Sequence, residues 1–100
     1  SIAGLHTRST ISTRILLLGA SGMLGHMLAR VLAPDHFVIG TTLSQYNERS
    51  HLVRILSKDN WIDQVDVRSL PMVEKVIRET DPDVIINCVG LIKQKMNINK

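Results

Sequence analysis

The chain has 100 residues, enough for one small domain with a single hydrophobic core. Its hydrophobic content of 44% and charged content of 21% are typical of a folded globular chain, and its aromatic content of 3% argues against a base-stacking surface for single-stranded nucleic acid. The net charge of +3 resides in residues 1–34, which contain no Asp or Glu, so this part of the chain favours an anionic ligand.

Strand and helix patterns alternate after a short first segment. Residues 1–13 are rich in Ser and Thr and predict a flexible lead-in or tag, with the end of a transit-like segment as the alternative. The apolar run at 14–19 predicts a buried strand, and residues 37–42 predict a second. Between them, apolar residues at helical spacing predict a helix that ends at Pro34. Its predicted buried face consists of Leu24, Met27, Leu28, Val31 and Leu32.

The next part of the chain is harder to assign. Residues 44–58 are polar and predict a loop with at most a loose helical turn, and residues 61–67 predict a third strand. A second helix follows, with Ser69 as its N-cap and Pro71 in its first turn, and Asp81-Pro82 ends it. Its predicted buried face consists of Leu70, Val73, Val76 and Ile77.

Residues 83–90 predict the last strand, which is again apolar and β-branched. The resulting order, β-α-β-β-α-β, is the rhythm of a parallel sheet with right-handed crossovers. We therefore predict an α/β fold, the N-terminal portion of a Rossmann-type sheet, over residues 14–100. Such a portion would expose a sheet edge, so we expect it to be marginally stable alone unless it pairs with a second copy as a homodimer.

The turn after the first strand is the most informative motif. Gly19 permits a tight exit from the strand, Gly22 lets a pyrophosphate approach the backbone, and Gly25 lets the helix pack close to the sheet. The first N–H groups of the helix would face the phosphates. In this context the glycines predict a dinucleotide site, with packing alone as the alternative, and the absence of Gly-Lys-Ser/Thr excludes a Walker A loop. The predicted contacts in this turn are Gly19, Ser21, Gly22, Met23, Leu24 and Gly25.

The segment after the second strand bears on the choice of cofactor. An NAD site usually has an acid roughly 20 residues past the glycines, to bind the ribose hydroxyls. Here Thr41 and Thr42 occupy that region, and the first acid is Glu48. A 2′-phosphate would meet the two hydroxyls, with Arg49 in reach or simply solvated. The sequence therefore favours NADP, with NAD as the alternative.

Three segments, 14–26, 65–68 and 82–90, occur in a combination that resembles one family. Residues 14–93 look like the N-terminal half of an extended short-chain dehydrogenase/reductase, and most closely like the dTDP-4-dehydrorhamnose reductase-like sugar-nucleotide reductases. The resemblance implies that Asp66 contacts the adenine, aided by the backbone of Val67. It also implies that a segment near the cofactor ribose and pyrophosphate consists of Cys88, Val89 and Gly90.

The resemblance also sets the expected activity. The family's Tyr-x-x-x-Lys pair is missing here, because the single tyrosine, Tyr46, is followed four residues later by Ser50. We therefore expect a cofactor cradle with no catalytic residue. The parent would be a reductase of a 4-keto-6-deoxy sugar nucleotide. The alternatives are a sugar-nucleotide epimerase or dehydratase, and a regulatory or structural relative that binds the dinucleotide without catalysis.

Other classes of site and partner are not expected. No apolar run approaches the roughly 18 residues of a membrane span. The single cysteine, Cys88, allows no intrachain disulfide, is expected to be a packed residue, and suggests a reducing, cytoplasmic compartment. The histidines have no metal-ligand spacing, and Lys and Arg form no dense stripe for nucleic acid.

Overall fold

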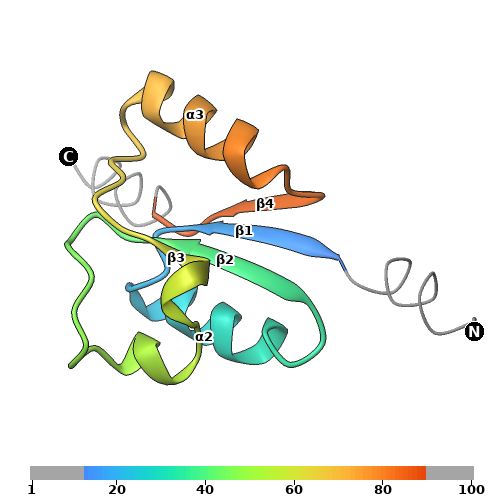
Figure 1. Ribbon diagram of the computed structural model, residues 1–100, viewed down its shortest axis with the longest axis vertical. Coiled ribbons are helices and arrows are strands. Elements are labelled where there is room, and N and C mark those ends of the chain that lie inside the picture. Colours follow the sequence, from blue (N-terminus) through green and yellow to red (C-terminus); the bar gives the residue numbers. More distant parts are fainter. Residues whose placement is uncertain (1–12, 90–100) are drawn as a thin grey trace, which may run out of the picture.

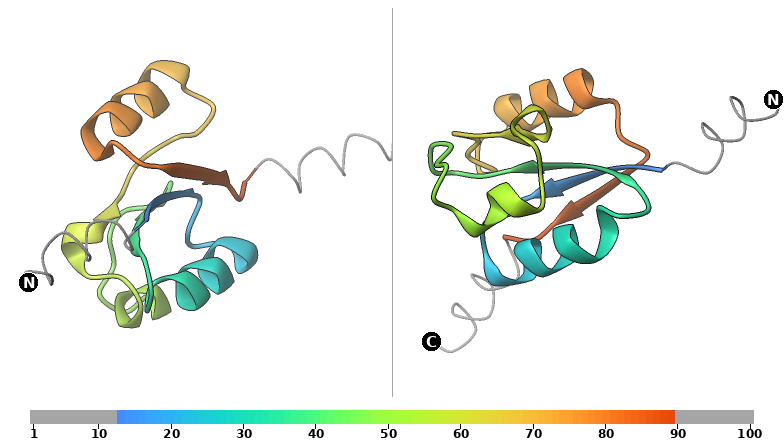
Figure 2. Two further views of the ribbon diagram at one scale, coloured as in Figure 1. Left: turned by 90° about the vertical axis from the view of Figure 1, so that its right-hand side faces the viewer. Right: turned by 60° about the horizontal axis from the view of Figure 1, so that its bottom comes forward.

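The computed structural model describes residues 13–89. Its elements, in chain order, are β1 (Arg14–Leu18), α2 (Met23–Leu32), β2 (Phe37–Thr41), the short 3₁₀ helices η1 (His51–Arg54) and η2 (Lys58–Asn60), β3 (Trp61–Ile62), α3 (Leu70–Thr80) and β4 (Val84–Asn87). In this part of the chain, four parallel strands form one sheet in the order β3-β2-β1-β4. Helix α2 covers one face of the sheet and α3 the other (Figures 1 and 2). The α/β class and the parallel sheet are confirmed.

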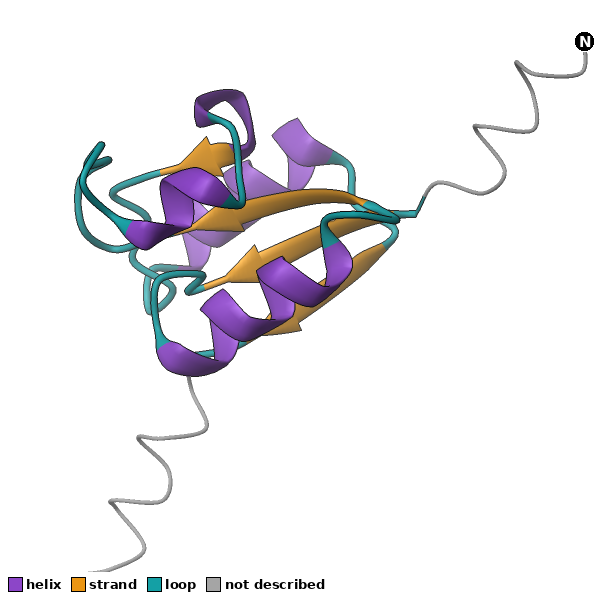
Figure 3. Cartoon of the chain, turned by 90° about the horizontal axis from the view of Figure 1, so that it is seen from below, coloured by secondary structure: helices purple, strands orange, loops and turns teal. Residues whose placement is uncertain are grey.

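Strand β1 is the centre of the sheet. Leu16 aligns with Ile39 of β2 on one side and with Ile85 of β4 on the other. All strand arrows run the same way, so the carboxyl ends of the strands meet at one edge (Figure 3). The chain leaves β1 through α2 and reaches β4 through α3 on the opposite face. The boundary between β1 and β4 is therefore the switch point at which ligands bind in open parallel sheets.

Two apolar clusters hold the layers together. The cluster on the α2 face contains Ile15, Leu17, Ala20, Ala29, Val38, Leu52, Leu56 and Trp61. The cluster on the α3 face contains Leu16, Leu18, Ile39, Val65 and Val76. The polar segment 44–58 thus contributes two core leucines through η1 and the residues after it, which the sequence did not predict. Buried residues in β1 alternate between the two clusters, as expected for a strand covered on both faces.

The predicted buried face of α2 is confirmed only in part: Leu28 and Leu32 pack against the core cluster, and the other three predicted residues are exposed. Leu24, Met27 and Val31 are 39%, 54% and 64% exposed, whereas the buried residues of this helix are Gly25 and Ala29. The helix approaches the sheet most closely through its smallest side chains, and this leaves Leu24, Met27 and Val31 at the outer side of the contact. Periodicity identified the helix and two of the residues that pack on the core, but not the residues of closest approach.

Two further predictions need correction, and the caps are confirmed. Strand β3 ends at Ile62 rather than at residue 67, because Gln64 adopts a left-handed conformation with φ of 56° and turns the chain. Leu70, predicted to be buried, is 67% exposed at the start of α3. The hydroxyl of Ser69 caps α3 by accepting from the Met72 N–H at 3.4 Å, and Asp81 ends the helix in a left-handed conformation.

Arg14 ties the amino-terminal edge of the sheet to α3. Its guanidinium donates to the carbonyl oxygen of Thr80 at 2.6 Å and to that of Asp81 at 3.1 Å, which are the last carbonyls of the helix. The same group lies 4.9 Å from the centre of the Phe37 ring. The backbone N–H of Arg14 donates to the carboxylate of Asp83 at 2.9 Å. One side chain therefore connects β1, β2 and the end of α3.

Candidate functional site

The glycine turn is held against the ends of two neighbouring strands. Gly19 has φ of 83°, a conformation that glycine adopts without strain. A side chain at this position would overlap Val89, which follows β4. The N–H groups of Gly19 and Ala20 both donate to the Thr41 carbonyl, at 3.1 Å and 2.7 Å. The turn is therefore fixed between the carboxyl ends of β2 and β4.

Gly25 and Gly22 have different surroundings. A Cβ at Gly25 would run into the carbonyl oxygen of Gly19 and lie 2.8 Å from the Ala20 Cα, so α2 begins in contact with the backbone of the turn. A Cβ at Gly22 would have no protein atom closer than the Gly19 carbonyl oxygen at 4.0 Å. Packing thus explains the glycine at position 25. By contrast, nothing within the described residues fills the space beside Gly22.

The start of α2 offers free donors next to that space. The first backbone bond of the helix runs from the His26 N–H to the Gly22 carbonyl at 2.8 Å, so the N–H groups of residues 23–25 have no intrahelical acceptor. The N-cap residue, Gly22, makes no side-chain cap, and no acid lies in the first turn. Ser21, Met23 and Leu24 are exposed around this point. The arrangement suits a bound anion such as a phosphate.

Thr41 and Thr42 use their hydroxyls inside the protein. They are 0% and 1% exposed. The Thr41 hydroxyl accepts from the Gly19 N–H at 3.2 Å, and the Thr42 hydroxyl accepts from the Trp61 indole at 2.8 Å and donates to the Ser44 carbonyl at 2.8 Å. The expectation that these hydroxyls meet a 2′-phosphate therefore gains no support from the packing. The first exposed side chains after β2 belong to residues 43–45.

The end of β3 is joined to the same edge. The Val65 N–H donates to the Thr42 carbonyl at 2.9 Å, which places Asp66 and Val67 directly after this contact. The Asp66 carboxylate accepts two bonds from the Arg68 guanidinium, each of 3.1 Å, and one from the Arg68 N–H at 2.9 Å. This carboxylate raises the pKa of Arg68 through its hydrogen bond and its charge. Asp66 is thus held by its own turn.

Cys88 and Val89 complete the edge on the other side of β1. The Cys88 N–H donates to the Leu18 carbonyl at 2.9 Å, and Val89 contacts the Gly19 position. Cys88 is 7% exposed, and burial raises the pKa of its thiol, so it is a packed thiol rather than a thiolate at neutral pH. Gly90 lies outside the described residues. The structure therefore brings the turn, residues 41–42, residues 65–67 and residues 88–89 to one edge.

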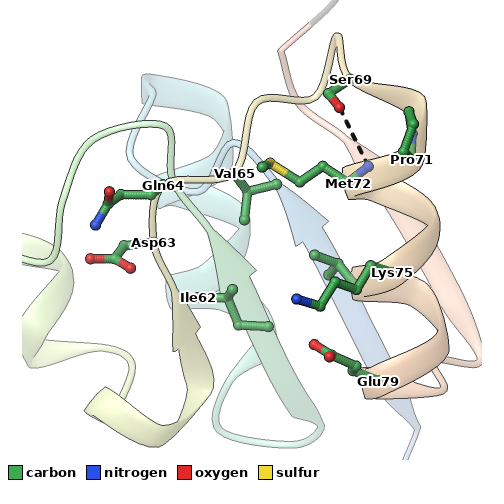
Figure 4. A pocket seen from close by; sticks show the side chains of 10 residues that line it. Ile62, Asp63, Gln64, Val65, Ser69, Pro71, Met72, Lys75 and Glu79 are labelled. Carbon is green, nitrogen blue, oxygen red and sulfur yellow. Dashed lines mark hydrogen bonds between the residues drawn. The ribbon is translucent and has the colours of Figure 1, made fainter.

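A cavity of about 430 Å³ lies elsewhere, on the α3 face between the end of β3 and the length of α3 (Figure 4). Its apolar lining includes Ile62, Val65 and Val76, and Lys75 and Glu79 line it from α3. No residue of the glycine turn lines it. Among residues 13–89, no helix is long and apolar enough to cross a membrane, and no group of three or more His, Cys, Asp or Glu residues could hold a metal ion.

A turn with three spaced glycines, between a buried parallel strand and a helix at the switch point of the sheet, is the arrangement of a dinucleotide site. The model of a family described as the NAD dependent epimerase/dehydratase family matches residues 15–100. The chain belongs to this family. Membership indicates a nicotinamide dinucleotide as the kind of cofactor and a sugar nucleotide as the kind of substrate. No curated protein matches the chain.

Proposed function

We propose that this chain supplies the cofactor site of an NADP-dependent reductase that acts on a 4-keto-6-deoxy sugar nucleotide. The observation that carries the proposal is the space at Gly22 that none of residues 13–89 fills, beside the first N–H groups of α2, which have no acceptor within the helix, at the switch point of the sheet. The reductase activity rests on the resemblance of segments 14–26, 65–68 and 82–90. No step of catalysis is assigned to a residue of this chain.

The residues present fit a dinucleotide along the carboxyl edge of the sheet. Gly22 and the N–H groups of residues 23–25 would bind the pyrophosphate, with Ser21 beside them. Asp66 and the backbone of Val67 would bind the adenine. By the same resemblance, the segment of residues 88–90 would line the cofactor beside its ribose and pyrophosphate. When bound, the nicotinamide supplies the hydride.

The NADP preference is proposed on charge. The first exposed side chains after β2, those of Leu43, Ser44 and Gln45, are neutral, so no carboxylate among these three would repel a 2′-phosphate. The first acid after these residues along the chain is Glu48. The Asp63 carboxylate accepts from the Tyr46 N–H at 2.6 Å. Tyr46 itself packs edge-on against Trp61, with ring centres 4.6 Å apart, in a structural role.

Thermal unfolding with NADPH, NADH and no ligand tests the proposal, with a Gly22→Val variant as the matched control. Residue 22 has extended backbone angles that valine adopts, so the variant should fold. Its side chain would occupy the proposed phosphate space. A ligand present at 100 times its Kd adds about 2.7 kcal/mol to the stability of the folded state. We expect this stabilisation with NADPH in the wild type and its loss in the variant, and an equal response of both proteins would refute the cradle.

The family description itself favours a second candidate, a sugar-nucleotide epimerase or dehydratase. Such enzymes return the hydride to the sugar, so they show no net consumption of cofactor, whereas a reductase oxidises one NADPH for each ketone reduced. Absorbance of NADPH during turnover by the intact protein separates the two. A dinucleotide-binding relative without catalysis would neither oxidise NADPH nor convert the sugar nucleotide.

A further inference from the structure

The backbone of Asp66 is held by a sulfur atom. Its N–H donates to the thioether of Met72 at 3.2 Å. Met72 lies in the first turn of α3, where its own N–H donates to the Ser69 hydroxyl at 3.4 Å. The Ser69 N–H in turn donates to the Asp66 carbonyl at 2.9 Å. These three bonds close the segment from Asp66 to Met72 on itself.

The contact resembles a capping box in its design but differs in its atoms. In a capping box, the third residue of the helix is Glu or Gln, and its side chain reaches back to accept a backbone N–H before the helix. Here the third residue is methionine, and it accepts the N–H of a residue three positions before the cap. A thioether is a weak acceptor. The Met72 side chain extends from α3 toward Val65, with its sulfur near the end of the side chain (Figure 4).

Packing alone does not require this sulfur. Met72 is 38% exposed and borders the cavity on the α3 face, so a leucine would fill a similar space. What leucine would remove is the acceptor for the Asp66 N–H. Arg68 holds the carboxylate of the same residue, so Asp66 is fixed at its backbone by Met72 and at its side chain by Arg68.

We propose that Met72 is a positioning residue that orients Asp66 for recognition of the adenine ring. The inference rests on the proposed function, in which Asp66 binds the adenine, and takes the contact to be the Asp66 carboxylate accepting from the adenine amino group. A hypoxanthine ring has a carbonyl oxygen at that place, which a carboxylate repels. The ratio of affinities for the adenine and hypoxanthine dinucleotides therefore reports how well Asp66 is oriented.

Two variants separate the sulfur's role from packing. Met72→Leu keeps the volume and removes the acceptor, whereas Met72→Gln supplies an amide oxygen at similar reach. Isothermal titration with NADPH and with its hypoxanthine analogue gives the ratio for each protein. We expect the leucine variant to lose about two- to fivefold of the discrimination, the range of a weak hydrogen bond, and the glutamine variant to retain it. Met27→Leu, on the exposed side of α2, is the matched control and should keep the wild-type ratio.

The outcomes distinguish the two proposals. If the wild type discriminates and the leucine variant discriminates equally well, Met72 does not position Asp66, and the cofactor site stands. If the glutamine variant loses as much discrimination as the leucine variant, the acceptor is not the cause and the inference is also overturned. If the wild type binds neither dinucleotide, the proposed function fails, and the inference fails with it.

Discussion

Replacing Gly25 with alanine should destabilise the fold, although alanine is the better helix former. The added Cβ would overlap the Gly19 carbonyl oxygen and lie 2.8 Å from the Ala20 Cα, and both are backbone atoms that no side-chain rotation can move. Overpacking costs about 1–3 kcal/mol, and a rigid backbone contact belongs at the upper end. The higher helix propensity of alanine offsets about 1 kcal/mol of this. We expect a net loss of about 2 kcal/mol, or roughly 8–16 °C in Tm for a domain of this size.

The fluorescence of Trp61 provides the assay, because it is the single tryptophan and is 7% exposed in the folded state. Gly22→Ala is the control, since a Cβ there has no neighbour closer than 4.0 Å and its cost as an N-cap should stay below about 1 kcal/mol. Thermal and urea unfolding of both variants should agree in rank. A Gly25→Ala protein as stable as the wild type would refute the close contact between α2 and the turn.

Three further changes have defined outcomes. Arg14→Met should lower the free energy of unfolding in urea by about 2 kcal/mol, because it removes the donor to the Thr80 carbonyl. Arg14→Lys should recover only part of this loss. An unchanged midpoint in the methionine variant would contradict the role of the guanidinium. Since burial raises the pKa of the Cys88 thiol, the folded state binds its proton more tightly than the unfolded state, so stability should fall as pH rises through the alkaline range. Cys88→Ala should remove that part of the pH dependence, and an identical profile would exclude the thiol as its source. Leu43→Asp should weaken NADPH binding relative to NADH by about fivefold or more in titrations, whereas Leu43→Asn should not, and equal ratios would place the 2′-phosphate elsewhere.

The features predicted correctly from the sequence depend on local chemistry. The apolar run of β1, the cap at Ser69 and the tight exit from the strand at Gly19 each follow from a short stretch of chain. The family assignment confirms the dinucleotide class of site that the glycine spacing indicated. These signals are strong because each residue type meets a need of the backbone at its own position.

The features that the sequence did not predict depend on residues far apart in the chain. The stripe that contains Met27 and Val31 has the right spacing for a buried face, yet closeness of approach favours Gly25 and Ala29. The hydroxyl of Thr42 is available on sequence grounds alone, and only its contact with the indole of Trp61 shows that it is occupied. Partners that already occupy a hydroxyl, such as this indole, can be identified only in the folded structure.

The contacts of Arg14 stabilise the fold at one edge of the sheet, away from the edge that carries the candidate cofactor site. They tie β1, Phe37 and the end of α3 together at the amino-terminal edge, whereas the glycine turn lies at the opposite, carboxyl edge. Substitutions that adjust stability can therefore accumulate at one edge while those that alter ligand choice accumulate at the other. The ligand specificity of such a domain can therefore change during evolution without substitutions in the contacts that stabilise its fold.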